Sequence, residues 1–131
     1  MLNHIIIMGR LTKDPELRYT QNNTPVASFT LACDRDYTEK GQERQTDFLN
    51  CIAWRGTGEF VSRNFVKGQM AVVSGRLQTR KWEDRDGKKH TEYEVIAENI
   101  YFGEAKKKEE EPKESKQTFT ETAETDDELP F

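Results

Sequence analysis

Two tryptophans in this chain stand among arginines and lysines, in segments whose residue types are typical of β-strands. Successive strand side chains point to opposite sides, and one such alternate set in residues 69–82 is Arg76, Gln78, Arg80 and Trp82. A flat indole beside guanidinium groups can stack on another planar ring and neutralise a negative group next to it. An unpaired nucleic acid strand offers both partners, because its bases expose open faces and its phosphates are charged. This face therefore indicates binding of single-stranded nucleic acid.

A second group of aromatic residues surrounds the segment 46–54. The larger side chains Phe48, Asn50, Ile52 and Trp54 share one parity, whereas the other parity holds the smaller set Leu49, Cys51 and Ala53. The larger rings are thus expected to face away from the core. The stacking candidates in these two segments are Phe48, Trp54 and Trp82.

Basic residues cluster around the same segments. Residues 76–89 contain six basic residues against three acids, a local net charge of +3. Cations next to stacking rings are suited to contacts with phosphate groups. The candidate phosphate contacts are Arg55, Arg76, Arg80, Lys81, Lys88 and Lys89.

The elements that must position these side chains are mostly strands. Apolar, β-branched and aromatic runs predict strands over residues 3–11, 25–33, 46–54, 69–82 and 90–102, with a hairpin turn at Asp86-Gly87. A helical spacing of apolar residues predicts one helix over 58–67, capped by Thr57 and closed by Gly68. Five strands with one short helix between the third and the fourth predict an all-β, five-stranded Greek-key barrel of the OB type. Residues 1–103 have the length of one such domain.

The first strand also indicates self-association. Its run Ile5-Ile6-Ile7-Met8 is apolar on both faces, which suits a strand buried in the core on one side and against another layer or subunit on the other. Cys33 and Cys51 lack metal-ligand spacing and are expected to be small buried residues without a disulfide.

The end of the chain has a different composition. Residues 104–131 contain five lysines and ten acids, a net charge of −5, whereas residues 1–103 have a net charge of +1. With few large apolar residues, this tail is expected to be disordered, with a linker over 104–125. Its last six residues combine an acidic run with an apolar end, and they predict a tip that binds a basic, apolar pocket of another protein: Asp126, Asp127, Glu128, Leu129, Pro130 and Phe131.

Several short motifs, in this order, resemble the bacterial single-stranded DNA-binding protein family. They include Gly9-Arg10-Leu11, Asp14-Pro15-Glu16, Arg18-Tyr19, Thr30-Leu31-Ala32, Gln45-Thr46-Asp47-Phe48, Lys67-Gly68, Gly75-Arg76-Leu77, Thr79-Arg80-Lys81-Trp82 and the acidic tip 126–131. In that family the stacking positions match Trp54 and Trp82, and the positions of Phe48 and Tyr37 are often held by Trp. The resemblance therefore adds Tyr37 to the stacking candidates. The linker here is shorter and richer in Lys and Glu than the family's Gly/Gln/Pro-rich linker.

The resemblance implies a cytoplasmic, nucleoid-associated homotetramer of OB folds. Such a protein wraps single-stranded DNA during replication, recombination and repair, and it recruits partner proteins through its tips.

Other readings of the sequence remain open. A small nuclease on an OB barrel would need convergent acids and a metal, and no inward-pointing Asp or Glu is evident in any predicted strand. A protein-interaction adaptor would keep the barrel without needing stacked aromatic residues or the acidic tip. We expect no catalysis, no cofactor and no metal site, and no apolar run approaches the length of a membrane span.

Overall fold

The computed structural model describes residues 1–104, and the predicted linker and tip lie outside these described residues apart from Glu104. Six strands and one helix follow each other along the chain: β1 Ile5–Leu11, β2 Glu16–Tyr19, β3 Pro25–Asp34, β4 Thr46–Trp54, α1 Arg55–Asn64, β5 Met70–Glu83 and β6 Lys89–Phe102. Within this part of the chain, no helix has the length and apolarity needed to cross a membrane.

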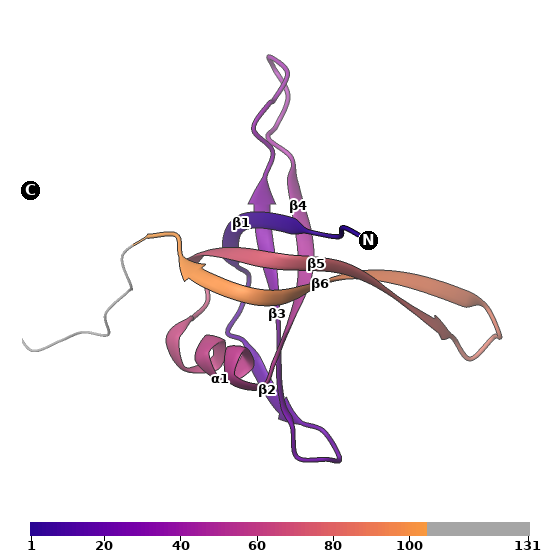
Figure 1. Cartoon of the computed structure of the whole chain (residues 1–131). Helices are drawn as coiled ribbons and strands as arrows, with labels where there is room; N and C mark the ends of the chain where they lie inside the picture. Colours follow the sequence, from indigo (N-terminus) through magenta and orange to yellow (C-terminus); the bar gives the residue numbers. More distant parts are fainter. Residues whose placement is uncertain (105–131) are drawn as a thin grey trace, which may run out of the picture.

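The sheet closes into a barrel. Its strand order is β1-β5-β6-β4-β3-β2, and an additional pairing of β1 with β3 joins the two sides. All pairings are antiparallel except that of β4 with β6. The five strands β1, β3, β4, β5 and β6 form the barrel, so the predicted all-β OB-type fold is confirmed. The β3–β4 and β5–β6 hairpins extend well beyond it as two long arms (Figure 1).

The four-residue strand β2 was not predicted from the sequence. It pairs with β3 alone, as an edge strand outside the closed barrel. Three of its four residues are exposed, so it lacks the apolar alternation by which strands are found in a sequence.

The core is filled by alternate strand residues and by the helix. Its fully buried side chains include Leu11, Leu31, Cys51, Val61, Phe65, Val73 and Val95. Phe65, just after α1, stacks on Phe102 with ring centroids 4.6 Å apart, and Phe60 packs edge-on against both rings. Both Cys33 and Cys51 are free thiols; Cys51 is buried as expected, whereas Cys33 is only half-buried.

The helix is confirmed between the third and fourth predicted strands, but its predicted ends are wrong. It begins at Arg55, directly after β4, and no side chain caps it, so Thr57 is not the cap. It ends at Asn64, and Gly68 adopts its φ of 86° in the turn that leads into β5. Because strand and helix join without a loop, the residue pair Trp54 and Arg55 lies at a sharp corner of the molecule.

A glycine marks the point where β5 leaves the barrel. The pairing of β5 with β6 is irregular between Ser74 and Gly75, and a Cβ built on Gly75 would lie 1.9 Å from the Ile96 carbonyl oxygen. Only glycine allows this close approach. Before Gly75, β5 alternates buried and half-buried residues, whereas most residues after it are exposed. Leu77 has the same parity as the barrel-lining Ala71 and Val73, but it is 39% exposed because it lies on the arm.

Candidate nucleic-acid interface

Four aromatic side chains that were predicted to stack on bases are exposed on the surface. The exposed fractions are 75% for Tyr37, 65% for Phe48, 44% for Trp54 and 39% for Trp82. Tyr37 and Phe48 lie on the β3–β4 arm, Trp54 at the corner between β4 and α1, and Trp82 on the β5–β6 arm. Exposed rings of this kind can serve as platforms on which unpaired bases stack.

The alternation of β4 explains two of these positions. Cys51 and Ala53 are buried in the barrel, with exposed fractions of 1% and 0%, so the residues of opposite parity must face outward. Phe48 lies opposite Ala32 of β3, and Trp54 lies opposite Val26. The predicted orientation of this strand is therefore confirmed.

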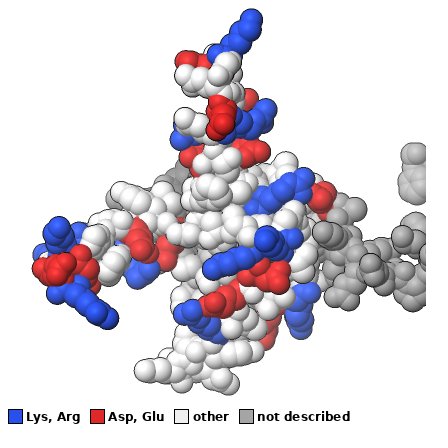
Figure 2. Space-filling view, turned by 180° about the vertical axis from the view of Figure 1, so that it is seen from behind, with Lys and Arg blue, Asp and Glu red and all other residues white. Residues whose placement is uncertain are grey.

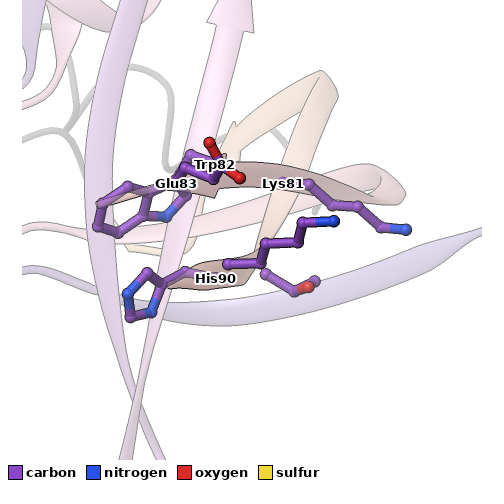
Figure 3. Close-up of a pocket in the computed structure, with 6 residues that line it drawn as sticks. Lys81, Trp82, Glu83 and His90 are labelled. Carbon is purple, nitrogen blue, oxygen red and sulfur yellow. The ribbon is translucent and has the colours of Figure 1, made fainter. Parts of the chain in front are cut away.

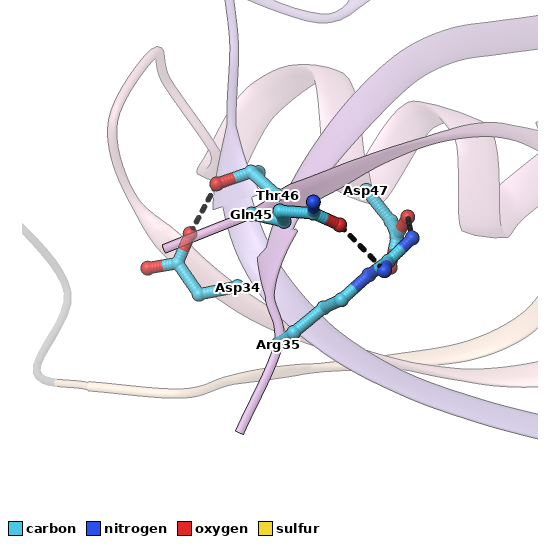
Figure 4. A network of polar contacts seen from close by, with 5 residues as sticks. All are labelled: Asp34, Arg35, Gln45, Thr46 and Asp47. Carbon is cyan, nitrogen blue, oxygen red and sulfur yellow. Dashed lines mark hydrogen bonds and ion pairs between the residues drawn. The ribbon is translucent and has the colours of Figure 1, made fainter. Parts of the chain in front are cut away.

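A polar network holds the base of the β3–β4 arm (Figure 4). The Arg35 guanidinium donates from Nε and Nη2 to the Asp47 carboxylate at 3.1 and 3.0 Å, and from Nη1 to Gln45 Oε1 at 2.6 Å. Thr46 Oγ1 donates to Asp34 Oδ1 at 2.7 Å. The Arg35 hydrogen bonds lower the pKa of Asp47, so its carboxylate stays charged at neutral pH. The network joins the two strands where they leave the barrel, and thereby fixes the direction of the arm.

The β5–β6 arm has two faces with different cations. Arg76, Arg80 and Trp82 lie on one face of β5, and His90 is the cross-strand partner of Trp82. Lys81 has the opposite parity, as does Lys89 of β6, while Lys88 belongs to the loop between the strands. Seen from behind, basic and acidic side chains are interspersed near the ends of both arms (Figure 2). The predicted cations are therefore spread around the arm and do not form one stripe.

Arg80 is paired with two acids, which the sequence analysis did not foresee. Its Nη2 lies 2.6 Å from Glu92 Oε2 and its Nε lies 3.4 Å from Glu94 Oε2. Glu94 has an exposed fraction of only 7%, yet it shares the outer face of the hairpin with Arg80, whereas its neighbour Val95 belongs to the core. The carboxylate is compensated by Arg80, and residues 1–104 contain no group of three or more potential metal ligands.

Arg55 has an unusual backbone. Its φ is 56°, the left-handed region that costs a non-glycine residue about 1–2 kcal/mol. It directly follows the exposed Trp54, so the strained residue is next to a candidate stacking ring. Backbone strain that a fold retains is often found at functional sites.

A second exposed surface is apolar. Ile6 and Met8 project from β1 with exposed fractions of 64% and 56%. On β5, Ser74 lies opposite Ile6 and Val72 lies opposite Met8. Val72 in turn lies opposite the exposed Tyr101 of β6. Apolar residues thus cover the outer face of β1 as well as its inner face, as its sequence indicates.

Together these features define a class of protein. A closed five-stranded barrel of the OB type, with exposed rings and adjacent cations on its arms, is an architecture suited to binding oligonucleotides or oligosaccharides. The separate rings and the mixed charge point to a long, flexible ligand that touches several places.

Comparison with known proteins makes the assignment specific. The sequence model of the Single-strand binding protein family matches residues 2–103, and the chain belongs to this family. It is 50% identical over 106 residues to "Single-stranded DNA-binding protein 2" of Listeria monocytogenes, which covers 81% of this chain and 66% of the relative. It is also 50% identical over 106 residues to "Single-stranded DNA-binding protein A" of Bacillus subtilis, covering 81% of this chain and 62% of the relative.

A third relative gives the same picture. The chain is 50% identical over 102 residues to "Single-stranded DNA-binding protein" of Bacillus cereus, covering 78% of this chain and 60% of the relative. The chain therefore spans less than two thirds of the length of these three relatives, and the family match over residues 2–103 covers the barrel and its arms.

Proposed function

We propose that this protein binds single-stranded DNA without sequence preference and performs no catalytic step. The observation that carries the proposal is the exposure of Tyr37, Phe48, Trp54 and Trp82 on the two arms and the corner of an OB-type barrel. Stacking tolerates any base, because every base has an open π-face. Membership of the single-strand binding family and the names of the relatives support the same ligand.

Fluorescence titration tests this proposal directly. The chain contains two tryptophans, Trp54 and Trp82, and both belong to the proposed interface. Saturating oligo(dT) should strongly quench their emission, whereas a blunt duplex of equal length should not, because its bases are already stacked. Emission that oligo(dT) leaves unchanged would contradict the proposal. Labelled oligo(dT) that is shortened when magnesium or calcium is added would support a nuclease instead.

The proposed assembly is a homotetramer. The exposed apolar side chains of β1 and its neighbours support self-association, because water-exposed Ile6, Met8 and Tyr101 would be buried in an interface between copies. Sedimentation equilibrium should give four chains per particle, and Ile6→Glu should shift the particle to a smaller mass. The control is Ile52→Glu on β4, a strand that does not pair with β1, and it should leave the mass unchanged. A wild-type monomer would contradict this part of the proposal.

The proposed cellular role follows from the ligand. Single strands arise in the cytoplasm during replication, recombination and repair of DNA, and a protein that covers them protects them there. We assign recruitment of the proteins of these processes to the tip, residues 126–131, whose acids and terminal Leu-Pro-Phe suit a basic, apolar pocket.

A further inference from the structure

An imidazole covers part of the indole on the β5–β6 arm. The rings of Trp82 and His90 stack with centroids 4.5 Å apart and an interplanar angle of 21°. The two residues are direct partners across the β5–β6 hairpin, and Figure 3 shows their rings lying one over the other. The Trp82 side chain is still 39% exposed, so the stack leaves part of the indole open to a ligand.

The imidazole is itself held from the hairpin loop. His90 Nε2 lies 2.8 Å from Asp84 Oδ2. The other carboxylate oxygen, Asp84 Oδ1, accepts the backbone N–H groups of Asp86 and Lys88, each at 2.9 Å. The hydrogen bond from His90, followed by that from Lys88, holds the pKa of Asp84 below its usual range, so the anchor stays ionised at neutral pH. One carboxylate thus shapes the loop and fixes the ring.

Among residues 1–104, His90 is the aromatic neighbour of Trp82. Trp82 lies on a two-stranded ribbon beyond the barrel, and within residues 1–104 no other ring stacks on it. An indole that could rotate freely would lose that freedom when a base stacked on it, and this loss would weaken binding. A ring that is already fixed avoids that loss.

The stacked rings of Trp82 and His90 line a hollow that has room for one base. The hollow, of about 540 Å³, is lined by Lys81, Trp82, Glu83, Lys89, His90 and Thr91. A base can enter against the open part of the indole, whereas Lys81 projects to the other side of the hairpin from the two rings (Figure 3), as does Lys89 by its pairing with Glu83. Glu83 is the acidic residue that lines the hollow, and it lies opposite Lys89 in the hairpin.

We propose that His90 is a positioning residue for DNA binding: anchored by Asp84, its imidazole stacks on one face of Trp82 and fixes the indole so that the other face receives a base. This inference rests on the proposed binding of single-stranded DNA at Trp82. In the opposite arrangement a base displaces His90 from Trp82. His90→Ala would then strengthen DNA binding, because it removes a competitor of the base.

A double-mutant cycle tests the proposal with labelled oligo(dT) and the full-length protein. His90→Ala should weaken binding about two- to tenfold, the range of an aromatic pair. If His90 acts through Trp82, the same substitution in a Trp82→Ala background should have no further effect. Tighter binding by His90→Ala, unchanged binding, or an undiminished loss in the Trp82→Ala background would each overturn the proposal.

A second readout reports the ring itself. In a Trp54→Phe background Trp82 is the sole tryptophan, and His90→Ala should lower its fluorescence anisotropy in the free protein. His90→Phe, the matched control, keeps a stacking ring and should recover most of the anisotropy and of the DNA affinity. Unchanged anisotropy in His90→Ala would refute the positioning role even if DNA did not bind, whereas wild-type protein without affinity for oligo(dT) would refute the proposed function alone.

Discussion

Arg76 and Arg80 provide a matched pair of arginines on one face of β5, and the structure predicts different consequences of removing them. Arg80 is paired with Glu92 and with the buried Glu94. Within residues 1–104, no hydrogen bond or ion pair joins the Arg76 side chain to another residue. The charge of Arg76 is therefore available to a phosphate, whereas that of Arg80 is already opposed by two carboxylates.

The expected magnitudes follow from these contacts. Each phosphate contact on a single strand contributes about 0.7 to the slope of log affinity against log salt, so Arg76→Ala should make the slope shallower by about that amount. Arg80→Ala should change the slope less. It should instead lower the free energy of unfolding by about 1 kcal/mol, because Glu94, whose side chain is 9% exposed, loses its cation while Arg80 itself is partly solvated.

The assay combines DNA binding with unfolding. Affinity for labelled oligo(dT) is measured over a series of NaCl concentrations, and stability is measured by urea unfolding of the same variants. The double variant Arg80→Ala with Glu94→Gln should regain stability without regaining affinity, because a neutral amide tolerates burial better than a lone carboxylate. An equal change of slope in Arg76→Ala and Arg80→Ala, with stability unaffected in both, would refute the reasoning.

Three further expectations follow. Burial raises the pKa of Cys51 to about 12, so iodoacetamide should modify Cys33 first. Because the folded state holds the Cys51 thiol proton more tightly than the unfolded state, the free energy of unfolding should fall as pH rises from about 9 towards 12. Cys51→Ala should reduce that fall. Arg55→Gly should relieve the left-handed backbone strain and raise the free energy of unfolding by about 1 kcal/mol, and it should weaken oligo(dT) binding. A lower free energy of unfolding in this variant would refute the strain argument. Deleting Asp126–Phe131 should leave oligo(dT) binding equal or slightly tighter but abolish capture of replication proteins from an extract, and retained capture would assign recruitment to the barrel.

Much of the barrel follows from alternation alone. Small and apolar residues at Cys51, Ala53, Ala71 and Val73 fill the barrel, so the sequence indicates which side chains of β4 and of the first half of β5 face outward. The same rule fails at Leu77, because the sequence does not reveal that β5 leaves the barrel at Gly75. Alternation determines the side of a strand, whereas burial also depends on what covers that side.

The predicted ends of the helix were wrong for a related reason. Thr57 is a good capping residue by type, but β4 runs directly into α1 and the helix begins at Arg55 without a side-chain cap. The left-handed φ of Arg55 makes this sharp junction possible, and a non-glycine residue gives no sequence signal for it. The pairing of Arg80 with Glu92 and Glu94 was missed because it depends on the register of β5 against β6.

Register also explains why the stack of His90 on Trp82 was not predicted. A two-residue turn at Asp86-Gly87 would place Thr91 opposite Trp82, with His90 on the other face of the ribbon. The hairpin instead closes through the loop 84–88, with Glu83 opposite Lys89, and this shift by one residue brings His90 opposite Trp82. The Asp84 carboxylate accepts hydrogen bonds from the backbone N–H groups of Asp86 and Lys88 in this loop, and it also holds His90. The residue that determines the register of the arm therefore also positions its candidate stacking ring, so a substitution at Asp84 should disturb both together.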